Sequence, residues 1–564
     1  MDTRDSSPSS PSAVPPRIFR LRSVAVFAFV ALACLTWRWS AMQSSLWVDE
    51  LHTSWVVADG WGEVVHRAHQ GNQSPLYFFL LRAWVGWVGS SEFTLRLPSL
   101  LSGLLLALGV SWLAIRWTRD HGLGLLAGLL IASDSRFIFY ATEARPYALL
   151  QCLAFWHILA ACRRWESPAI RRRLEFLLTG AGLFYVHYTG ALVWGASLVI
   201  ALALPRAWSC SVIHSGDPLS DSPSDSPSDS LSAVSSERAG PVSWWRRFRL
   251  VMADGGILLL LCSPTFPHLL EVLRRREAWN SFIPSDPPLY SVVASLNALH
   301  FVAIPVGIGL LVWTFGRFRS GYRIPTSQPV IAMACWWLIP VLAAWVATRA
   351  DVARLFFPRY LVSSAAGAVL LGTLCLGAAL PWRAAFRRRA VLRLVALVTL
   401  LVALLLDGYV LGMLTDGPRP LRREDWRGLA RVLEAQTSGD LADDREPLLL
   451  VRSGLIEADG LGPDPIEDRE LRAYCGYMFA GIYRLPADRW QVVPVANHSP
   501  FGISPAIRRE AAERREVWLA IRAARVRIPE LTMEVLEQLS LDGPKWEMER
   551  QWRFGNLALV LARK

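Results

Sequence analysis

The sequence lacks the cysteine spacings of a metal site or a redox motif. Its eight cysteines form no CxxC or CxxxC pair, and all but Cys475 fall in or beside apolar runs. Neither a zinc framework nor a disulfide framework is therefore predicted. Lysine is also scarce, so the net charge of +12 comes almost wholly from arginine. These arginines lie in short segments between apolar runs, a pattern typical of residues that fix membrane topology, and we predict no nucleic-acid partner.

Acidic residues are nearly absent from the long apolar runs, with Asp254 and Asp407 as the main exceptions. The runs are about 20 residues long, which is the length of helix that crosses the hydrocarbon core of a bilayer. The chain is 53% hydrophobic and holds 26 tryptophans, which favour the bilayer interface. These features predict a mainly α fold, a polytopic transmembrane bundle of about 11 spans followed by a C-terminal α/β domain.

The predicted spans are 22–42, 93–116, 122–140, 146–162, 174–187, 188–205, 250–270, 291–315, 328–348, 358–380 and 391–413. The segment 174–205 is also compatible with one bent span. The first apolar run is longer than the core of a signal peptide and follows several arginines, so it predicts an uncleaved span with the N-terminus inside. The predicted outer loops hold few basic residues, and the exceptions are Arg274–Arg276, Arg354 and Arg359.

The domain boundaries follow from composition. Residues 1–20 are predicted to be a disordered cytoplasmic tail, and 21–414 a transmembrane domain with a first outer loop at 43–92. Residues 207–247 form a low-complexity insert on the cytoplasmic side. Residues 415–564 alternate helical and short apolar patterns, which predicts a soluble α/β domain outside the membrane. Its predicted helices are 427–435, 504–515 and 530–539, and its predicted strands are 447–451, 490–495, 517–521 and 557–561.

Two adjacent carboxylates, Asp49 and Glu50, follow the first predicted span and should lie at the membrane surface. An acid there can act as a general base toward an acceptor hydroxyl, although Asp49 is equally suited to cap the helix that follows. His52, His66 and His69 lie in the same loop, but their spacing matches no standard zinc pattern, and surface histidines are the simpler interpretation. The aromatic run that follows, at 75–84, is too short to cross the bilayer and should lie along its surface.

A second charged site follows the third predicted span. Glu143 and Arg145 lie in a tight outer turn, because Pro146 begins the next helix. Charges in such a place are costly and commonly functional, and a structural ion pair is the alternative. His187 and Tyr188, at the outer turn between two short spans, are candidates to face the same cavity.

Six short motifs occur in a fixed order along the chain. They are Trp47-Val48-Asp49-Glu50, PLYFFLL at 75–81, SEFTLRLPS at 91–99, EARPY at 143–147, FPRYL at 357–361 and REDWR at 423–427. Together they resemble the GT-C membrane glycosyltransferases, in particular the RgtA/B/C/D-like group. That group is related to the protein O-mannosyltransferases and the lipid A aminoarabinose transferases. The match is dense over 45–200 and sparse beyond.

The resemblance implies an enzyme of the cytoplasmic (inner) membrane that moves a hexose or pentose from a polyprenyl-phosphate donor to a glycan, lipid or protein acceptor. Transfer would occur on the outer face, usually with inversion. The implied catalytic residues are Asp49 as general base, Glu50 and Glu143. The implied donor- and phosphate-binding residues are Arg145, Arg359, Tyr360, His187 and Tyr188, with Arg274–Arg276 as weaker alternatives. His52, His69 and Tyr77 are expected to line the cavity. Some members of the group need a divalent metal ion and others do not, so no cofactor is assigned.

Two other functions fit parts of the pattern. A transporter or flippase of lipid-linked glycans would carry charges along a pathway through the spans, whereas here the acids gather at one face. A catalytically degenerate scaffold would act through its outer domain, and the presence of Asp49, Glu50, Glu143 and Arg145 argues against it.

Overall fold

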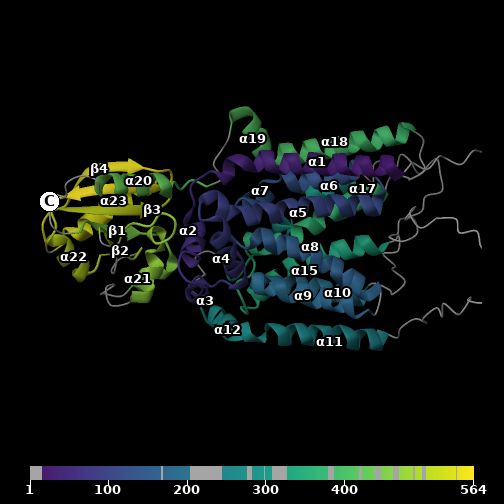
Figure 1. Cartoon of the computed structure of the whole chain (residues 1–564), viewed down its shortest axis with the longest axis horizontal. Coiled ribbons are helices and arrows are strands. Elements are labelled where there is room, and N and C mark those ends of the chain that lie inside the picture. The colour runs from purple at the N-terminus through teal and green to yellow at the C-terminus, as the bar shows by residue number, and fades with distance from the viewer. Residues whose placement is uncertain are drawn as a thin grey trace, which may run out of the picture.

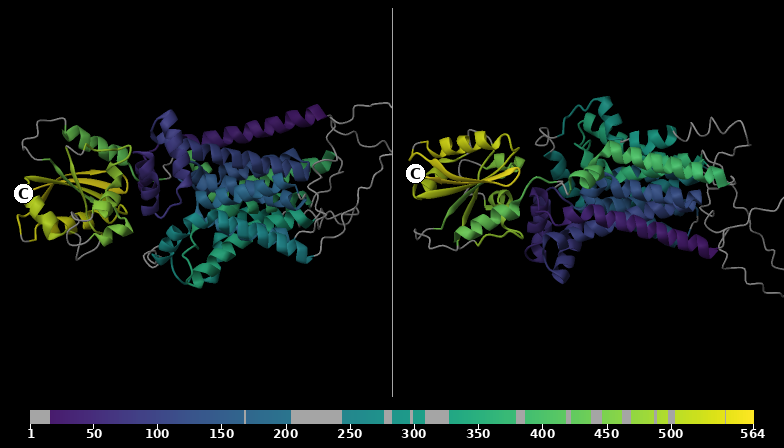
Figure 2. Two further views of the ribbon diagram at one scale, coloured as in Figure 1. Left: turned by 60° about the horizontal axis from the view of Figure 1, so that its bottom comes forward. Right: turned by 90° about the horizontal axis from the view of Figure 1, so that it is seen from above.

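The structure, a computed structural model, describes residues 16–166, 169–203, 244–275, 283–296, 299–307, 327–378, 386–417, 422–437, 446–461, 469–486, 489–497, 503–541 and 543–564. A body of helices carries a smaller α/β domain at one end (Figure 1). The two further views show the same arrangement (Figure 2). Residues 207–243 of the predicted insert lie outside the described residues, and its last four residues, 244–247, are helical. The predicted span 291–315 also lies partly outside the described residues.

The helices of the body lie at the predicted span positions that the structure describes. They are α1 (Pro16–Met42), α5 (Glu92–Thr118), α6 (His121–Ser133), α7 (Ser135–Ala141), α8 (Tyr147–Glu166), α9 (Ile170–Val186), α10 (Ala191–Ala203), α11 (Trp244–Cys262), α12 (Phe266–Arg274), α13 (Leu289–Ser295), α15 (Ser327–Arg349), α16 (Pro358–Leu361), α17 (Ala365–Ala378), α18 (Phe386–Asp407) and α19 (Tyr409–Asp416). One correction concerns the N-terminal tail, because α1 begins at Pro16 and residues 16–20 are helical.

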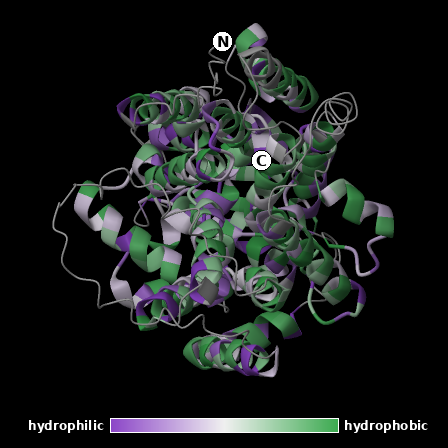
Figure 3. Ribbon diagram, turned by 90° about the vertical axis from the view of Figure 1, so that its right-hand side faces the viewer, coloured by the Kyte–Doolittle hydropathy of each residue, from purple (hydrophilic) through white to green (hydrophobic). Residues whose placement is uncertain are grey.

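Five helical segments of the described chain are long and apolar enough to cross a membrane, and two bent helix pairs raise the number to seven. The helices α8, α9 and α10 do not meet this test of length and apolarity. Hydrophobic residues predominate along the helices (Figure 3). The chain is therefore a multi-pass membrane protein with the mainly helical fold that its hydropathy predicts.

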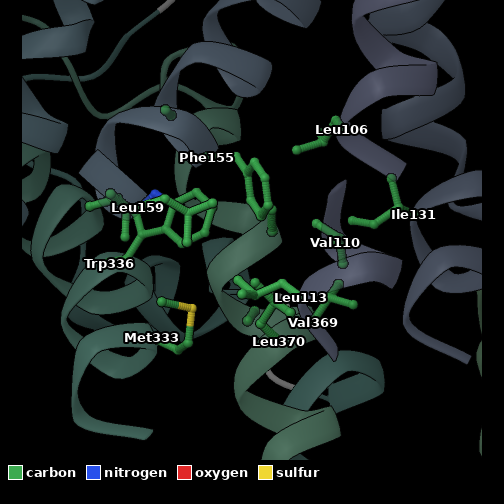
Figure 4. Close-up of a cluster of buried hydrophobic side chains, with 14 of the residues drawn as sticks. Leu106, Val110, Leu113, Ile131, Phe155, Leu159, Met333, Trp336, Val369 and Leu370 are labelled. Atoms are coloured by element: carbon green, nitrogen blue, oxygen red, sulfur yellow. The ribbon is translucent and has the colours of Figure 1, made fainter. Parts of the chain in front are cut away.

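The core of the body lies around α5, which packs against α1, α6, α7 and α8. Phe155 and Trp336 lie in this core among aliphatic side chains (Figure 4). The indole N–H of Trp336 donates to the carbonyl oxygen of Ser363 at 3.0 Å, so the buried ring leaves no free donor. At Gly103 of α5, a Cβ would lie 2.5 Å from the Cβ of Ala141. Glycine therefore lets the end of α7 approach α5, which places the following turn, 142–146, beside the first outer loop.

The two acids of the apolar runs have structural partners. Asp407 accepts hydrogen bonds from the backbone N–H and the hydroxyl of Ser135, both at 2.9 Å, where the α6–α7 pair is bent by 65°. Asp254 is fully buried and pairs with Arg164 at 3.2 Å and Arg173 at 2.6 Å. Both acids therefore stabilise local structure, and the buried charge of Asp254 is compensated by two arginines.

Residues 43–92, which the sequence predicts to be the first outer loop, contain three short helices: α2 (Val48–Val56), α3 (Trp61–Gln70) and α4 (Leu76–Val88). They lie between the helical body and the α/β domain (Figure 1). The predicted aromatic run forms α4, whose Leu80 and Trp87 are 53% and 83% exposed. Exposed apolar side chains of this kind suit a helix at a bilayer surface.

The C-terminal domain contains one five-stranded sheet in the order β2-β1-β3-β5-β4. Its strands are β1 (Leu448–Arg452), β2 (Gln491–Pro494), β3 (Glu516–Arg522), β4 (Glu547–Arg553) and β5 (Leu557–Arg563), and its α-helices are α20 (Trp426–Thr437), α21 (Arg469–Cys475), α22 (Pro505–Ala512) and α23 (Ile528–Leu539). Strand β1 pairs in parallel with β2 and β3, and β5 pairs antiparallel with β3 and β4. This confirms the α/β domain that the sequence predicts.

The two faces of this sheet pack against different partners. Leu449 and Trp518 on one face join a hydrophobic cluster with α20 and with Leu51 and Phe78 of the first outer loop. Leu450, on the other face, packs with residues of α22 and α23. Because alternate residues of a strand point to opposite faces, the domain shares one of its two hydrophobic clusters with the outer loop.

Candidate active site

The N-terminus of α2 is capped by carboxylates other than Asp49. The backbone N–H of Trp47 donates to Glu50 at 3.3 Å, and that of Val48 donates to Glu424 at 3.1 Å. Trp47 is the N-cap residue, so Asp49 lies in the first turn. The alternative that Asp49 caps the helix is therefore wrong, and its carboxylate is available for other contacts.

The carboxylate of Asp49 faces two arginines from distant parts of the chain. Arg359 donates to Asp49 Oδ2 at 2.9 Å, and Arg145 donates to the Asp49 carbonyl oxygen at 3.3 Å. Burial raises the pKa of Asp49, but the opposing charges of Arg145 and Arg359 outweigh it and hold the pKa below its ordinary value. Asp49 is therefore an ionised acceptor with 22% of its side chain exposed.

A cavity of about 200 Å³ opens beside this carboxylate. The helical body and first outer loop line it with Trp47, Val48, Asp49, His52, Gly71, Gln73, Arg145, Tyr147, Ile283, Phe357, Arg359 and Tyr360. The C-terminal domain lines it with Gly454, Leu455, Ile456, Glu457, Tyr474, Tyr477 and Arg522. The site is thus shared between the two parts of the molecule.

Glu50 does not line this cavity, in contrast to the expectation that it acts with Asp49. Its side chain is fully buried and accepts two hydrogen bonds from Arg96, at 2.7 and 2.6 Å. It also accepts from the backbone N–H of Ala144 at 2.8 Å and lies 3.7 Å from Arg422. Neighbouring residues of a helix are rotated by about 100°, so Glu50 points into the protein while Asp49 points into the cavity.

Glu143 also lies outside the cavity lining. Its side chain is 1% exposed, and its Oε2 atom has no hydrogen-bond partner among the described residues. Burial raises the pKa of Glu143 from 4.5 to about 7, although the charges of Arg422 and Arg145 oppose the rise. This carboxyl therefore titrates near neutral pH rather than staying ionised.

The substitution Glu143→Gln is expected to raise the melting temperature of the purified protein by several degrees at pH 8 and to leave it unchanged at pH 5. Between pH 4.5 and about 7 the folded protein keeps a proton on Glu143 that the unfolded chain has released, so stability falls as the pH rises. The rise in pKa corresponds to a loss of roughly 3 kcal/mol of folding stability above pH 7, and glutamine avoids this loss because it does not titrate. Thermal unfolding of both proteins at the two pH values measures the effect, and equal pH profiles would contradict it.

His52 lines the cavity as expected, in a neutral form. Its Nε2 lies 3.2 Å from the carbonyl oxygen of Arg67. Burial, together with the charge of Arg145, lowers the pKa of His52 to about 3. A Cβ at Gly71 would lie 2.3 Å from His52 Nε2, so only glycine leaves room for the ring. His52 therefore lines the cavity and does not act as a proton acceptor at neutral pH.

Four other predicted residues do not line the cavity. The His187 ring lies 5.4 Å from that of Tyr147 and 5.7 Å from that of Tyr360, so it supports two lining residues. Tyr188 bonds His268 Nδ1 at 2.7 Å. His69 stacks on the same His268 ring with centroids 3.7 Å apart.

The fourth of these residues is Tyr77, whose side chain is buried in the cluster shared by the outer loop and the C-terminal domain. The weaker phosphate candidates are placed only in part. Arg275 pairs with Glu271 of its own helix, and Arg276 lies outside the described residues. Neither Tyr77 nor Arg275 is among the residues that line the cavity.

The residues that sequence reasoning missed come from the C-terminal domain and from the segment leading into it. Glu424 accepts from Val48 at the start of α2 and from Arg522 at 2.8 Å. It thereby joins the first outer loop to strand β3. The REDWR motif signals the importance of this segment, but its partners are far away in sequence and no pattern identifies them.

Metal ligands are not grouped in the described part of the chain. No set of three or more His, Cys, Asp and Glu side chains among these residues is arranged to hold an ion. The carboxylate of Asp49 faces Arg359 and Arg145.

The helical bundle and its C-terminal α/β domain have the GT-C type of fold that the motifs predict. The structure is similar to that of ArnT from Cupriavidus metallidurans in the apo state, with a TM-score of 0.50 and 15% identity over 95% of this chain and 97% of that chain. For the same protein bound to undecaprenyl phosphate, the TM-score is 0.48 with 16% identity over the same shares of the two chains.

An apo oligosaccharyltransferase from Archaeoglobus fulgidus also matches, with a TM-score of 0.45 and 12% identity over 89% of this chain and 69% of that chain. The sequence matches no protein-family model and no curated protein. At these identities, the comparison with apo ArnT establishes the fold and leaves the activity to be inferred from the site.

Proposed function

We propose that this protein is a membrane glycosyltransferase that moves a sugar from a polyprenyl-phosphate donor to an acceptor, with Asp49 as the general base. The observation that carries the proposal is the ion pair of Asp49 with Arg359 at 2.9 Å, on the wall of a cavity that Arg145 also lines. An ionised acid beside two arginines combines a proton acceptor with a site for an anionic leaving group.

The reaction follows from these groups. The acceptor hydroxyl attacks the anomeric carbon from the side opposite the phosphate, which inverts the configuration. Its proton passes to Asp49, and the bond between the anomeric carbon and the phosphate oxygen breaks with both electrons leaving on the phosphate. Arg359 and Arg145 stabilise the charge that develops there. When the phosphate binds Arg359, Asp49 loses its closest cationic partner, and the pKa of its carboxyl rises.

The proposed orientation places the cavity and the C-terminal domain on the outer face of the cytoplasmic membrane and the N-terminus inside. It is supported by the many arginines in the predicted cytoplasmic loops. Arg359 is an exception, because it is a basic residue in a predicted outer loop. Its ion pair with Asp49 supplies a reason for its presence there.

A flippase of lipid-linked glycans remains the alternative function, but the acids in the apolar runs do not favour it. Asp254 and Asp407 are both occupied by structural hydrogen bonds. They therefore offer no charged pathway through the described helices.

The test is transfer by purified full-length protein in lipid nanodiscs and in liposomes. Radiolabelled undecaprenyl-phosphate hexoses and pentoses are supplied with saccharide, lipid and serine-containing peptide acceptors. The expected result is a labelled acceptor and free undecaprenyl phosphate in equal amounts. Movement of the labelled donor across the liposome membrane without a transfer product would instead establish the flippase.

A further inference from the structure

The two walls of the cavity differ in charge. The wall from the helical body presents Arg145 and Arg359 around Asp49. The wall from the C-terminal domain presents the carboxylate of Glu457, the phenol rings of Tyr474 and Tyr477, and Arg522, whose charge is paired with Glu424. A phosphate is attracted to the first wall and repelled by Glu457, so the donor headgroup belongs on the first wall.

Glu457 lies in a short 3-10 helix, Ile456–Gly460, and is partly buried. Its carboxylate accepts a hydrogen bond from its own backbone N–H and is attracted by the charge of Arg275. An ionised carboxylate has about four lone-pair sites, so it can accept further hydrogen bonds from a ligand. Arg522, the arginine of the same wall, is engaged elsewhere, because it donates to Glu424 at 2.8 Å and to the Ser453 carbonyl oxygen at 3.4 Å. The wall therefore presents a hydrogen-bond acceptor beside aromatic rings.

This wall is fixed relative to Asp49. The Tyr477 hydroxyl donates to the carbonyl oxygen of Val48 at 3.2 Å, and the backbone N–H of Ile482 donates to the Ser54 hydroxyl at 2.8 Å. Both bonds join the C-terminal domain to α2, the helix that carries Asp49. A ligand held by Glu457 is thus kept in the same cavity as the proposed base.

We infer that the C-terminal wall, with Glu457 and Tyr474, is the acceptor subsite and that it takes a saccharide through its hydroxyl groups. This inference rests on the proposed function and adds the class of acceptor. A sugar ring carries hydroxyls that donate to a carboxylate and C–H groups that pack on aromatic rings, and this wall offers both partners. The acyl chains of a lipid acceptor would favour an apolar wall, and a peptide would favour backbone partners along an extended path.

The experiment compares wild-type protein with Glu457→Gln and Glu457→Asp in nanodiscs. The donor is undecaprenyl-phosphate hexose, and the acceptor probes are methyl glycosides of glucose, galactose, mannose and arabinose, a serine-containing peptide and a diacylglycerol. We expect the wild type to glycosylate methyl glycosides. Glu457→Gln should raise the acceptor KM by about 10-fold, with kcat and donor affinity changed less than about threefold, because one charged hydrogen-bond acceptor is lost. Glu457→Asp should recover part of the loss.

The matched control is Glu530→Gln, the same change at a 72% exposed side chain of the same domain, which should behave as wild type. Transfer to the peptide or the lipid but not to the glycosides would overturn the inference and leave the proposed function intact. An unchanged acceptor KM in Glu457→Gln, or an equal loss of donor affinity, would also overturn it. Absence of both donor binding and transfer in the wild type would overturn the proposed function itself.

Discussion

Asp49→Asn is expected to lower kcat for sugar transfer by about 10²- to 10⁴-fold, the usual contribution of a positioned general base. Asparagine has the same shape and still accepts a hydrogen bond from Arg359 through its amide oxygen. It cannot take the proton of an acceptor hydroxyl at neutral pH. The change should leave the melting temperature close to that of the wild type, because 22% of the Asp49 side chain is exposed and Glu50 and Glu424 keep the cap of α2.

The affinity for the donor shows whether Asp49 acts as a base or as a residue that binds the phosphate. Asparagine removes a negative charge beside Arg145 and Arg359, so the affinity for undecaprenyl phosphate should stay the same or rise. The control is Asp286→Asn, which removes an exposed carboxylate paired with Arg349 and should keep full activity. Full transfer activity in Asp49→Asn would exclude Asp49 as the base, and weaker donor binding would contradict its place opposite the phosphate.

The sequence predicts much of this site because its key residues belong to separate short motifs. Asp49, Arg145 and Arg359 are each in a different motif, and the structure brings all three to one cavity. Residue type and order were enough to select them. Residue type and order do not predict the direction of each side chain, because that direction depends on helical phase. Asp49 and Glu50 are adjacent in sequence, and one lies in the cavity while the other is buried behind it.

The residues that the C-terminal domain contributes to the cavity could not be predicted from the sequence, for a different reason. Glu457 and Tyr477 line the cavity, and the hydrogen bond from Tyr477 to Val48 joins them to α2, about 400 positions earlier in the chain. No local pattern encodes a pairing over that distance. Strand β4 was missed as well, because it is an edge strand with mostly exposed polar residues and has no apolar run.

The larger part of the fold did follow from hydropathy and periodicity. The predicted strand 517–521 corresponds to β3 (Glu516–Arg522), and the predicted helix 530–539 corresponds to α23 (Ile528–Leu539). In the membrane body, the predicted span 122–140 is broken at Asp134, whose carboxylate caps α7. A cap inside an apolar run is a weak signal beside the hydropathy around it, so length alone predicts one continuous helix.

Glu50→Ala is expected to destabilise the folded protein by about 3–5 kcal/mol, the usual cost of leaving a buried charge without its partner. Both Glu50 and Arg96 have fully buried side chains, and Arg422 lies 3.7 Å from the same carboxylate. Removing Glu50 therefore leaves two cations without their compensating charge. Differential scanning calorimetry or thermal unfolding in the same nanodiscs measures the loss. Glu547→Ala, which breaks the exposed pair with Lys545, should leave the melting temperature unchanged.

Further variants of Glu50, compared with Asp49→Asn, distinguish a positioning residue from a catalytic one. Glu50 binds Arg96 of α5 and the backbone of Ala144, so it fixes α2 relative to the turn that carries Arg145. Glu50→Gln should then lower the melting temperature and the transfer rate together, whereas Asp49→Asn should lower the rate alone. Combining Glu50→Leu with Arg96→Met should regain part of the stability, because an apolar pair replaces an unpaired charge. A Glu50→Gln protein that is as stable as the wild type but inactive would instead place Glu50 among the catalytic residues.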